Sequence, residues 1–159
     1  MTEVPALDGV HHVKLPVRDI ARSRAWYESR LGYEMTTEFV EDGEVAGIAM
    51  SHPNGGPMFA LRRDPELAEK AAGFDYFSIG VPSKSALEAL AERLTSLGES
   101  HAGVHFATIG WILPMTHDPD GHEVRFYTTE HHTDAHDDEI SRVDGAVETA
   151  ARREQELLS

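Results

Sequence analysis

The chain contains the same pattern of predicted secondary structure twice, and this internal repeat constrains its fold more than any other feature. Apolar residues alternate with polar ones over residues 12–17 and again over residues 75–81, as in strands with one buried face. In both copies the alternating segment leads into a helical pattern and then into three further strand patterns. The matching order predicts an α+β fold built from two similar modules. An unrelated α+β sandwich would have to reach the same order by chance.

Caps and turn residues delimit the other predicted elements. In the first copy, Asp19 can cap a helix that runs to about Leu31 and stops at Gly32. The strands predicted next lie at residues 33–41, 45–52 and 57–62, and a short helix follows at 64–72. In the second copy, Ser83 or Ser85 can cap a helix that ends near Leu97. The remaining predicted strands lie at residues 103–107, 111–116 and 123–128.

The repeat also predicts the domain organisation. Residues 8–129 should form one domain, with module one at 8–64 and module two at 74–129. The tail, residues 130–159, is expected to be an acidic linker followed by a helix at about 139–157. We expect a homodimer, and this last helix would pack over a module or extend the dimer contact.

Composition and charge exclude several classes of protein. The net charge of -14 argues against a nucleic-acid partner, because binding the phosphate backbone requires clustered Lys and Arg. The chain has no cysteine, so disulfides and thiolate chemistry are excluded. No apolar run approaches the roughly 18 residues that a membrane span needs. The N-terminal residues also lack the pattern of a signal peptide, so we expect a cytoplasmic protein with no membrane partner.

Three features together resemble one known family. The first is the segment His12–Asp19, HVKLPVRD, with Trp26-Tyr27 and Leu31-Gly32 after it, and the second is the repeated module. The third is the turn Asp118–Gly121, DPDG, which precedes a final apolar strand. Together they resemble the vicinal oxygen chelate superfamily, which groups glyoxalases, bleomycin-resistance proteins, fosfomycin-resistance enzymes and extradiol dioxygenases. The resemblance implies paired βαβββ modules whose mixed sheets curve into an open cup, with helices outside and a small-molecule ligand inside.

The resemblance also implies a divalent metal, but the residues at the implied ligand positions do not suit one. The family places a His or Gln on the first strand, often an acid on the fourth, a His on the fifth and a Glu on the eighth. Here those positions fall on His12, on residues 58–61 without an acid, on Tyr76 and on Arg125. A guanidinium repels a metal ion and has no lone pair to donate. We therefore expect no metal or other cofactor, with a divalent metal as the disfavoured alternative.

Strand alternation predicts which side chains face the ligand. The candidate catalytic residues are His12, Tyr76 and Arg125. The candidate ligand-binding residues from this alternation are Lys14, Ser78, Glu123 and Tyr127. Trp111 and Met115 could add an apolar wall, although the alternation is ambiguous in their strand, and His105 could also reach the ligand. Arg125 could bind an anionic group of the ligand. Its charge would also favour the phenolate form of Tyr76, and His12 is of the residue type that exchanges protons near neutral pH. These roles predict a metal-independent isomerase, epimerase or lyase that acts on a small anionic or carbonyl compound.

Two other functions stay open at this point. The protein could sequester a ligand without catalysis, as antibiotic-resistance proteins of the family do, and its acidity suits a cationic antibiotic. It could also be a glyoxalase or dioxygenase that holds its metal with unusual ligands. A further alternative is that His12, Tyr76 and Arg125 form a hydrogen-bonded cluster with a purely structural role.

Overall fold

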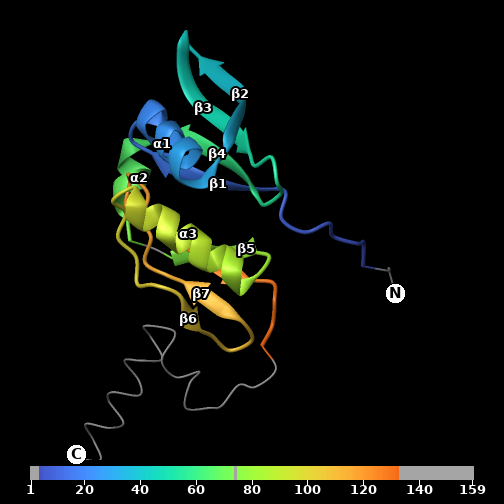
Figure 1. Ribbon diagram of the computed structural model, residues 1–159. Coiled ribbons are helices and arrows are strands. Elements are labelled where there is room, and N and C mark those ends of the chain that lie inside the picture. The colour runs from blue at the N-terminus through green and yellow to red at the C-terminus, as the bar shows by residue number, and fades with distance from the viewer. Residues whose placement is uncertain (1–3, 74, 133–159) are drawn as a thin grey trace, which may run out of the picture. The chain divides into compact units, whose positions relative to one another are not determined.

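Residues 4–73 and 75–132 are described by the computed structural model, and they divide into two units of the same topology (Figure 1). The first unit contains the chain up to residue 72 together with the turn Asp118–Asp120. The second contains the rest of the described chain from Gly73 on. The helix predicted at about 139–157 lies outside the described residues.

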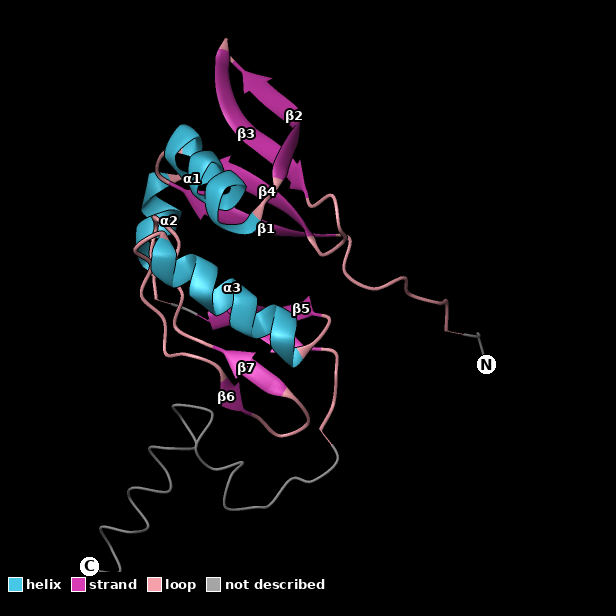
Figure 2. Cartoon of the chain, viewed as in Figure 1, coloured by secondary structure: helices cyan, strands magenta, loops and turns pink. Residues whose placement is uncertain are grey.

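The first unit is one mixed sheet with helices packed on one face. Its elements are β1 (His12–Val17), α1 (Ile20–Trp26), the π-helical turn η1 (Tyr27–Leu31), β2 (Glu34–Glu41), β3 (Glu44–Ser51), β4 (Met58–Arg63) and α2 (Pro65–Ala71). The strand order is β1-β4-β3-β2, with β1 parallel to β4 and the other pairs antiparallel (Figure 2).

Local sequence signals explain where the first helix begins and ends. The side chain of Asp19 accepts a hydrogen bond from the backbone N–H of Arg22, as expected for an N-cap. The helical segment stops at Gly32, whose φ of 79° is readily adopted by a residue without a Cβ. The predicted helix from Asp19 to about Leu31 is therefore present as α1 followed by η1.

The core of the first unit lies on the side of the sheet that the helices cover. Leu15 of β1 pairs in register with Leu61 of β4, and both side chains are almost fully buried. Phe59 of β4 also lies on this side, and its ring is 5.0 Å from the ring of Tyr27 in η1. We call the opposite side of the sheet the open face of the first unit.

The second unit repeats this plan. Its elements are β5 (Asp75–Val81), α3 (Lys84–Ser96), β6 (His105–Phe106), β7 (Trp111–Leu113) and β8 (Glu123–Thr128), and the strand order is β5-β8-β7-β6. Ser83 is the N-cap of α3, because its hydroxyl accepts a hydrogen bond from the N–H of Ala86. The buried side chains of β5 and β8, such as Ile79 and Phe126, lie on the α3 side, and the opposite side is the open face of the second unit. The predicted pair of βαβββ modules is thus confirmed, each with a four-stranded mixed sheet.

Two predicted strands of the second module are shorter than expected. The segment 103–107 pairs only over His105–Phe106, and the segment 111–116 pairs only over Trp111–Leu113. Pro114 lacks an N–H for the ladder, and Met115 has a φ of 66°, which an extended strand cannot accommodate. Among the described residues, no helix is both long and apolar enough to cross a membrane.

The turn Asp118–Asp120 belongs to the first unit because buried hydrogen bonds hold it there. The hydroxyl of Tyr27 donates to Asp118 Oδ2 at 2.9 Å, and the hydroxyl of Ser23 donates to Asp120 Oδ2 at 3.1 Å. Arg18 donates to Asp120 Oδ1 from its backbone N–H at 3.0 Å and from its guanidinium at 3.1 Å. The two carboxylates therefore anchor residues of the second half of the sequence to helix α1 and turn η1.

Candidate functional site

In the first unit, the predicted site residues lie exposed on the open face of β1. His12 and Lys14 alternate with buried Leu15 and Val17, so their side chains point away from the core. Nδ1 of His12 lies 2.9 Å from Nδ1 of His11. No described residue forms an ion pair or hydrogen bond with the Lys14 side chain, which leaves its charge available to a ligand.

In the second unit, Arg125 lies between two carboxylates. Its Nη2 is 2.6 Å from Asp75 Oδ2 and 3.6 Å from Glu123 Oε1. Glu123 Oε1 also accepts a hydrogen bond from the backbone N–H of Met115 at 2.8 Å. The side chains of Arg125, Asp75 and Glu123 are 19%, 35% and 12% exposed. We call these three residues the Arg125 cluster.

The register of β5 and β8 explains how the Arg125 cluster forms. Asp75 is paired with Glu123 across the two parallel strands, and Ser78 is paired with Arg125. An irregularity between these pairs lets Asp75 and Arg125 approach each other although they are not in register. Ser78 therefore lies beside Arg125, as strand alternation predicts.

Tyr76 is near a histidine that sequence reasoning did not select. The ring of Tyr76 is 39% exposed and makes an edge contact with the ring of His122, at a centroid distance of 5.8 Å. His122 is fully buried at the start of the last strand segment. Its position directly after the Asp118–Gly121 turn was the signal that could have drawn attention to it.

Three other predicted residues are distributed over both sides of the second sheet. Tyr127 lies on the open face, and its hydroxyl accepts a hydrogen bond from the N–H of Ile109 at 3.2 Å. His105 pairs with Ile112, which in turn pairs with Tyr127, so His105 belongs to the same face. By contrast, Trp111 lies on the helix side, where Nζ of Lys84, the first residue of α3, is 5.7 Å from its ring centroid.

Within the second unit, the structure places Glu123 and Ser78 next to Arg125, and Met115 contacts this group only through its backbone N–H, which donates to Glu123. It does not place Trp111 beside them. His12 and Lys14 belong to the first unit, where both lie on the open face of β1. Sequence reasoning missed Asp75, although its position next to Tyr76 on a strand expected to pair with the last strand was an available signal.

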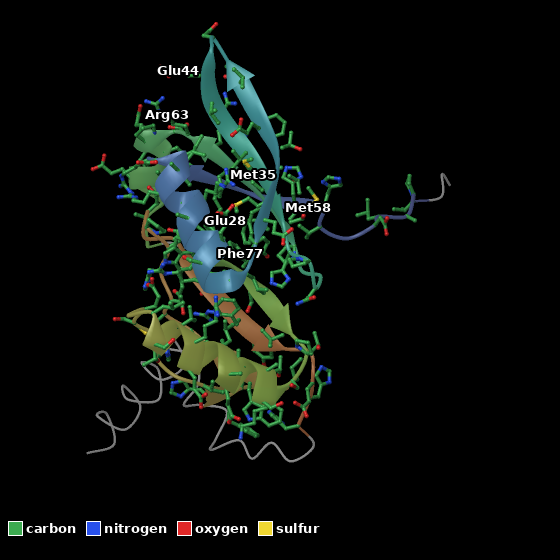
Figure 3. All side chains as sticks on the ribbon, turned by 45° about the horizontal axis from the view of Figure 1, so that its top comes forward. Glu28, Met35, Glu44, Met58, Arg63 and Phe77 are labelled. Atoms are coloured by element: carbon green, nitrogen blue, oxygen red, sulfur yellow. The ribbon has the colours of Figure 1, made fainter. Side chains whose placement is uncertain are left out.

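The first unit also has a groove of about 390 Å³ on its helix side, between α1 and the β2–β3 hairpin. Glu28 and Met35, labelled in Figure 3, are among the residues that line it. The guanidinium of Arg24 contacts both residues. Its Nε is 2.6 Å from Glu28 Oε1, and its Nη1 donates a hydrogen bond to Met35 Sδ at 3.3 Å. Arg24 and Glu28 of the groove already pair with each other, so the groove is a weaker candidate than the open faces.

The residues present do not fit the divalent metal that the resemblance implies. Within neither unit do the described residues bring together three or more His, Asp or Glu side chains that could hold a metal ion. At the position implied for a Glu ligand, the guanidinium of Arg125 carries a positive charge and is paired with Asp75. A cation at that position opposes binding of a second cation.

Comparison with known proteins agrees with this topology. The family model of the Glyoxalase/Bleomycin resistance protein/Dioxygenase superfamily matches residues 9–126. A glyoxylase/bleomycin resistance protein/dioxygenase domain from Frankia sp. EAN1pec is 28% identical, with a TM-score of 0.65 over 79% of this chain and 100% of that one. An antibiotic binding protein from a Streptomyces species is 15% identical, with a TM-score of 0.65 over 80% of this chain and 100% of that one.

A curated relative of this chain is a much longer protein. The catechol-2,3-dioxygenase of Bacillus subtilis is 26% identical over 101 residues, which cover 62% of this chain. The match spans only 35% of the length of that dioxygenase.

Proposed function

This chain belongs to the Glyoxalase/Bleomycin resistance protein/Dioxygenase superfamily, and on that premise we propose that it is a metal-independent enzyme acting on a small anionic or carbonyl compound. The observation that carries the proposal is the Arg125 cluster. A guanidinium paired with Asp75 and Glu123 stands where the family resemblance implies a metal-binding Glu. The protein would then have to supply positive charge and proton transfer from its own side chains.

We propose that the ligand-binding side chains lie on the open faces of the sheets. Module one would extend over residues 8–64 and module two over residues 74–129. Each open face carries exposed polar side chains opposite a buried core, as a ligand-binding surface requires. We further propose that the protein is cytoplasmic and forms a homodimer. Light scattering of the purified protein would test the dimer.

Four side chains have roles in the proposed reaction. Lys14, which pairs with no described residue, would bind the anionic group of the substrate. Tyr76 and His12 would act as the acid and the base, one removing a proton beside the carbonyl and the other returning a proton to the same or a neighbouring atom. Such an isomerisation or epimerisation consumes no oxidant. In a lyase step the bond to a leaving group beside the carbanion would break, and the acid would protonate that leaving group. Arg125, oriented by its two carboxylates, would stabilise negative charge that develops on the substrate oxygen.

Sequestration of a ligand without catalysis is the second candidate, and one observation favours it. The Arg125 cluster contains two carboxylates for one guanidinium, and the whole chain has a net charge of -14. Both would attract a cationic compound. The antibiotic binding protein from Streptomyces has the same fold, which makes antibiotics suitable test ligands.

A ligand screen followed by an exchange assay separates the two candidates. Thermal stabilisation would first be measured with small 2-oxo and 3-oxo acids and, separately, with cationic antibiotics. For each acid that stabilises the protein, NMR in deuterated water would then record exchange of the hydrogens beside the carbonyl. We expect exchange with the wild type in the presence of EDTA, and a large loss in Tyr76→Phe and in His12→Ala.

The matched control is Tyr33→Phe, which removes a hydroxyl that donates to Pro57 O in the first unit. It should retain exchange. Full turnover by both Tyr76→Phe and His12→Ala would refute the proposed acid and base. Stabilisation by antibiotics alone, with no exchange of any acid, would favour sequestration. Stoichiometric divalent metal that is needed for turnover would refute the metal-independent reaction.

A further inference from the structure

We infer that the Arg125 cluster is a cation seat in which the guanidinium is the resident cation, and that one substitution converts the seat into a divalent-metal site. The inference goes beyond the proposed function, because it concerns what the two carboxylates can hold, whatever reaction the protein catalyses. It starts from the disagreement between the residues at this position and the metal that the family resemblance implies.

The burial of the cluster shows that its carboxylates depend on a nearby positive charge. The side chain of Glu123 is only 12% exposed and has lost most of its hydration, whereas that of Asp75, at 35%, has lost part of it. Two carboxylates this close repel each other, and a cation between them offsets both the repulsion and the desolvation. Arg125 Nη2 occupies that location, 2.6 Å from one carboxylate and 3.6 Å from the other.

The seat is held by the backbone of the second sheet. Asp75 and Glu123 are paired in register on the neighbouring strands β5 and β8, which fixes the separation of their Cα atoms. Glu123 is further restrained because its Oε1 accepts the N–H of Met115. Removal of the guanidinium would therefore leave the two carboxylates close together and not let them separate freely into solvent.

Carboxylate oxygens are the ligands that Mg²⁺, Ca²⁺ and Mn²⁺ prefer. Replacement of Arg125 by Glu removes the resident cation and adds a third carboxylate to the two already present. The charge of the three side chains then changes from -1 to -3, which a divalent ion partly neutralises. We therefore expect Arg125→Glu to bind Mn²⁺ at this seat and the wild type to bind none there.

The test measures Mn²⁺ binding and thermal unfolding of the full-length chain, with no activity assay. Arg125→Glu should bind one Mn²⁺ per chain in calorimetry. Its thermal midpoint should rise by about 5–10 °C when free Mn²⁺ is about 100 times Kd. The wild type should show neither effect. Addition of Asp75→Asn to Arg125→Glu should lower the affinity at least about tenfold, because it removes one charged ligand.

The matched control is Arg63→Glu. Arg63 lies 3.1 Å from Glu44 at the end of the first sheet, and both residues are labelled in Figure 3. This pair is largely exposed, so the same exchange of Arg for Glu should create no Mn²⁺ site. If Arg125→Glu does not fold, Arg125→Gln decides the question, because it removes the guanidinium and should bind Mn²⁺ through the two native carboxylates.

The inference is overturned if the folded Arg125 variant binds no more Mn²⁺ than Arg63→Glu. It is also overturned if the wild type binds Mn²⁺ as well as Arg125→Glu does, since the guanidinium would then not occupy the seat. Neither outcome bears on proton transfer, which is tested with the wild type and the variants of His12 and Tyr76.

Discussion

The buried hydroxyl of Tyr27 should contribute more to stability than that of Tyr33, although both belong to one group of aromatic rings. Tyr27 is fully buried and donates to the carboxylate of Asp118 at 2.9 Å, whereas Tyr33 donates to the neutral carbonyl of Pro57 at the same distance. The substitutions Tyr27→Phe and Tyr33→Phe keep each ring and remove only the oxygen. The comparison therefore isolates the charge of the acceptor.

The magnitudes follow from the two acceptors. A hydrogen bond to a charged group contributes about 1.5–3 kcal/mol, and one between neutral groups about 0.5–1.5 kcal/mol. Asp118 is only 5% exposed, so water replaces the lost donor poorly. We expect Tyr27→Phe to lower the free energy of unfolding by about 2 kcal/mol and Tyr33→Phe by about 1 kcal/mol.

Urea unfolding followed by tryptophan fluorescence would measure both changes. The chain has two tryptophans, Trp26 in the first unit and Trp111 in the second. In a Trp111→Phe background the signal comes from Trp26 alone, whose ring is 4.9 Å from that of Tyr27. A loss for Tyr33→Phe equal to or larger than that for Tyr27→Phe would refute the reasoning, because the charge of Asp118 would then have no effect.

Three further predictions follow from the same contacts. Burial, and for Tyr27 also the charge of Asp118, raises the pKa of both tyrosines above the usual 10, so stability should be constant below about pH 10 and fall above it as the unfolded chain ionises. The double variant Tyr27→Phe/Tyr33→Phe should show a flatter decline in pH-dependent urea unfolding. Asp120→Asn replaces the buried carboxylate that accepts hydrogen bonds from Arg18 with a neutral amide. It should lower the free energy of unfolding by about 2–3 kcal/mol in the same assay. An unchanged midpoint would contradict this. Ser83→Ala removes the N-cap of α3 and should cost about 1 kcal/mol, measured with Trp111 as the probe.

Much of the fold could be predicted because its signals are local. Alternation along β1 and β5 depends only on neighbouring residues, and it correctly separated buried Leu15 and Val81 from exposed His12 and Lys14. Strand lengths were predicted less well. Pro114 was an available signal for the end of β7 at Leu113, whereas the positive φ of Met115 is not indicated by the residues around it.

The candidate site was predicted in part. Alternation alone identifies the open-face residues of β8, including Arg125. It does not identify Asp75 as the partner of Arg125, because that contact depends on an irregularity in the pairing of β5 and β8. It leaves the face of Trp111 ambiguous, and the structure places that ring beside Lys84 on the helix side.

The sequence by itself determined the duplicated module, the ends of the helices and the presence of an arginine where a metal-binding carboxylate was implied. These features depend on periodicity, capping and residue identity, all of which act over a few neighbouring positions. Only the tertiary structure decided which charges Arg125 meets and that Asp118 and Asp120 are anchored to α1 and η1. Contacts between residues far apart in the chain arise from strand register and from how a turn packs, and no local pattern encodes either.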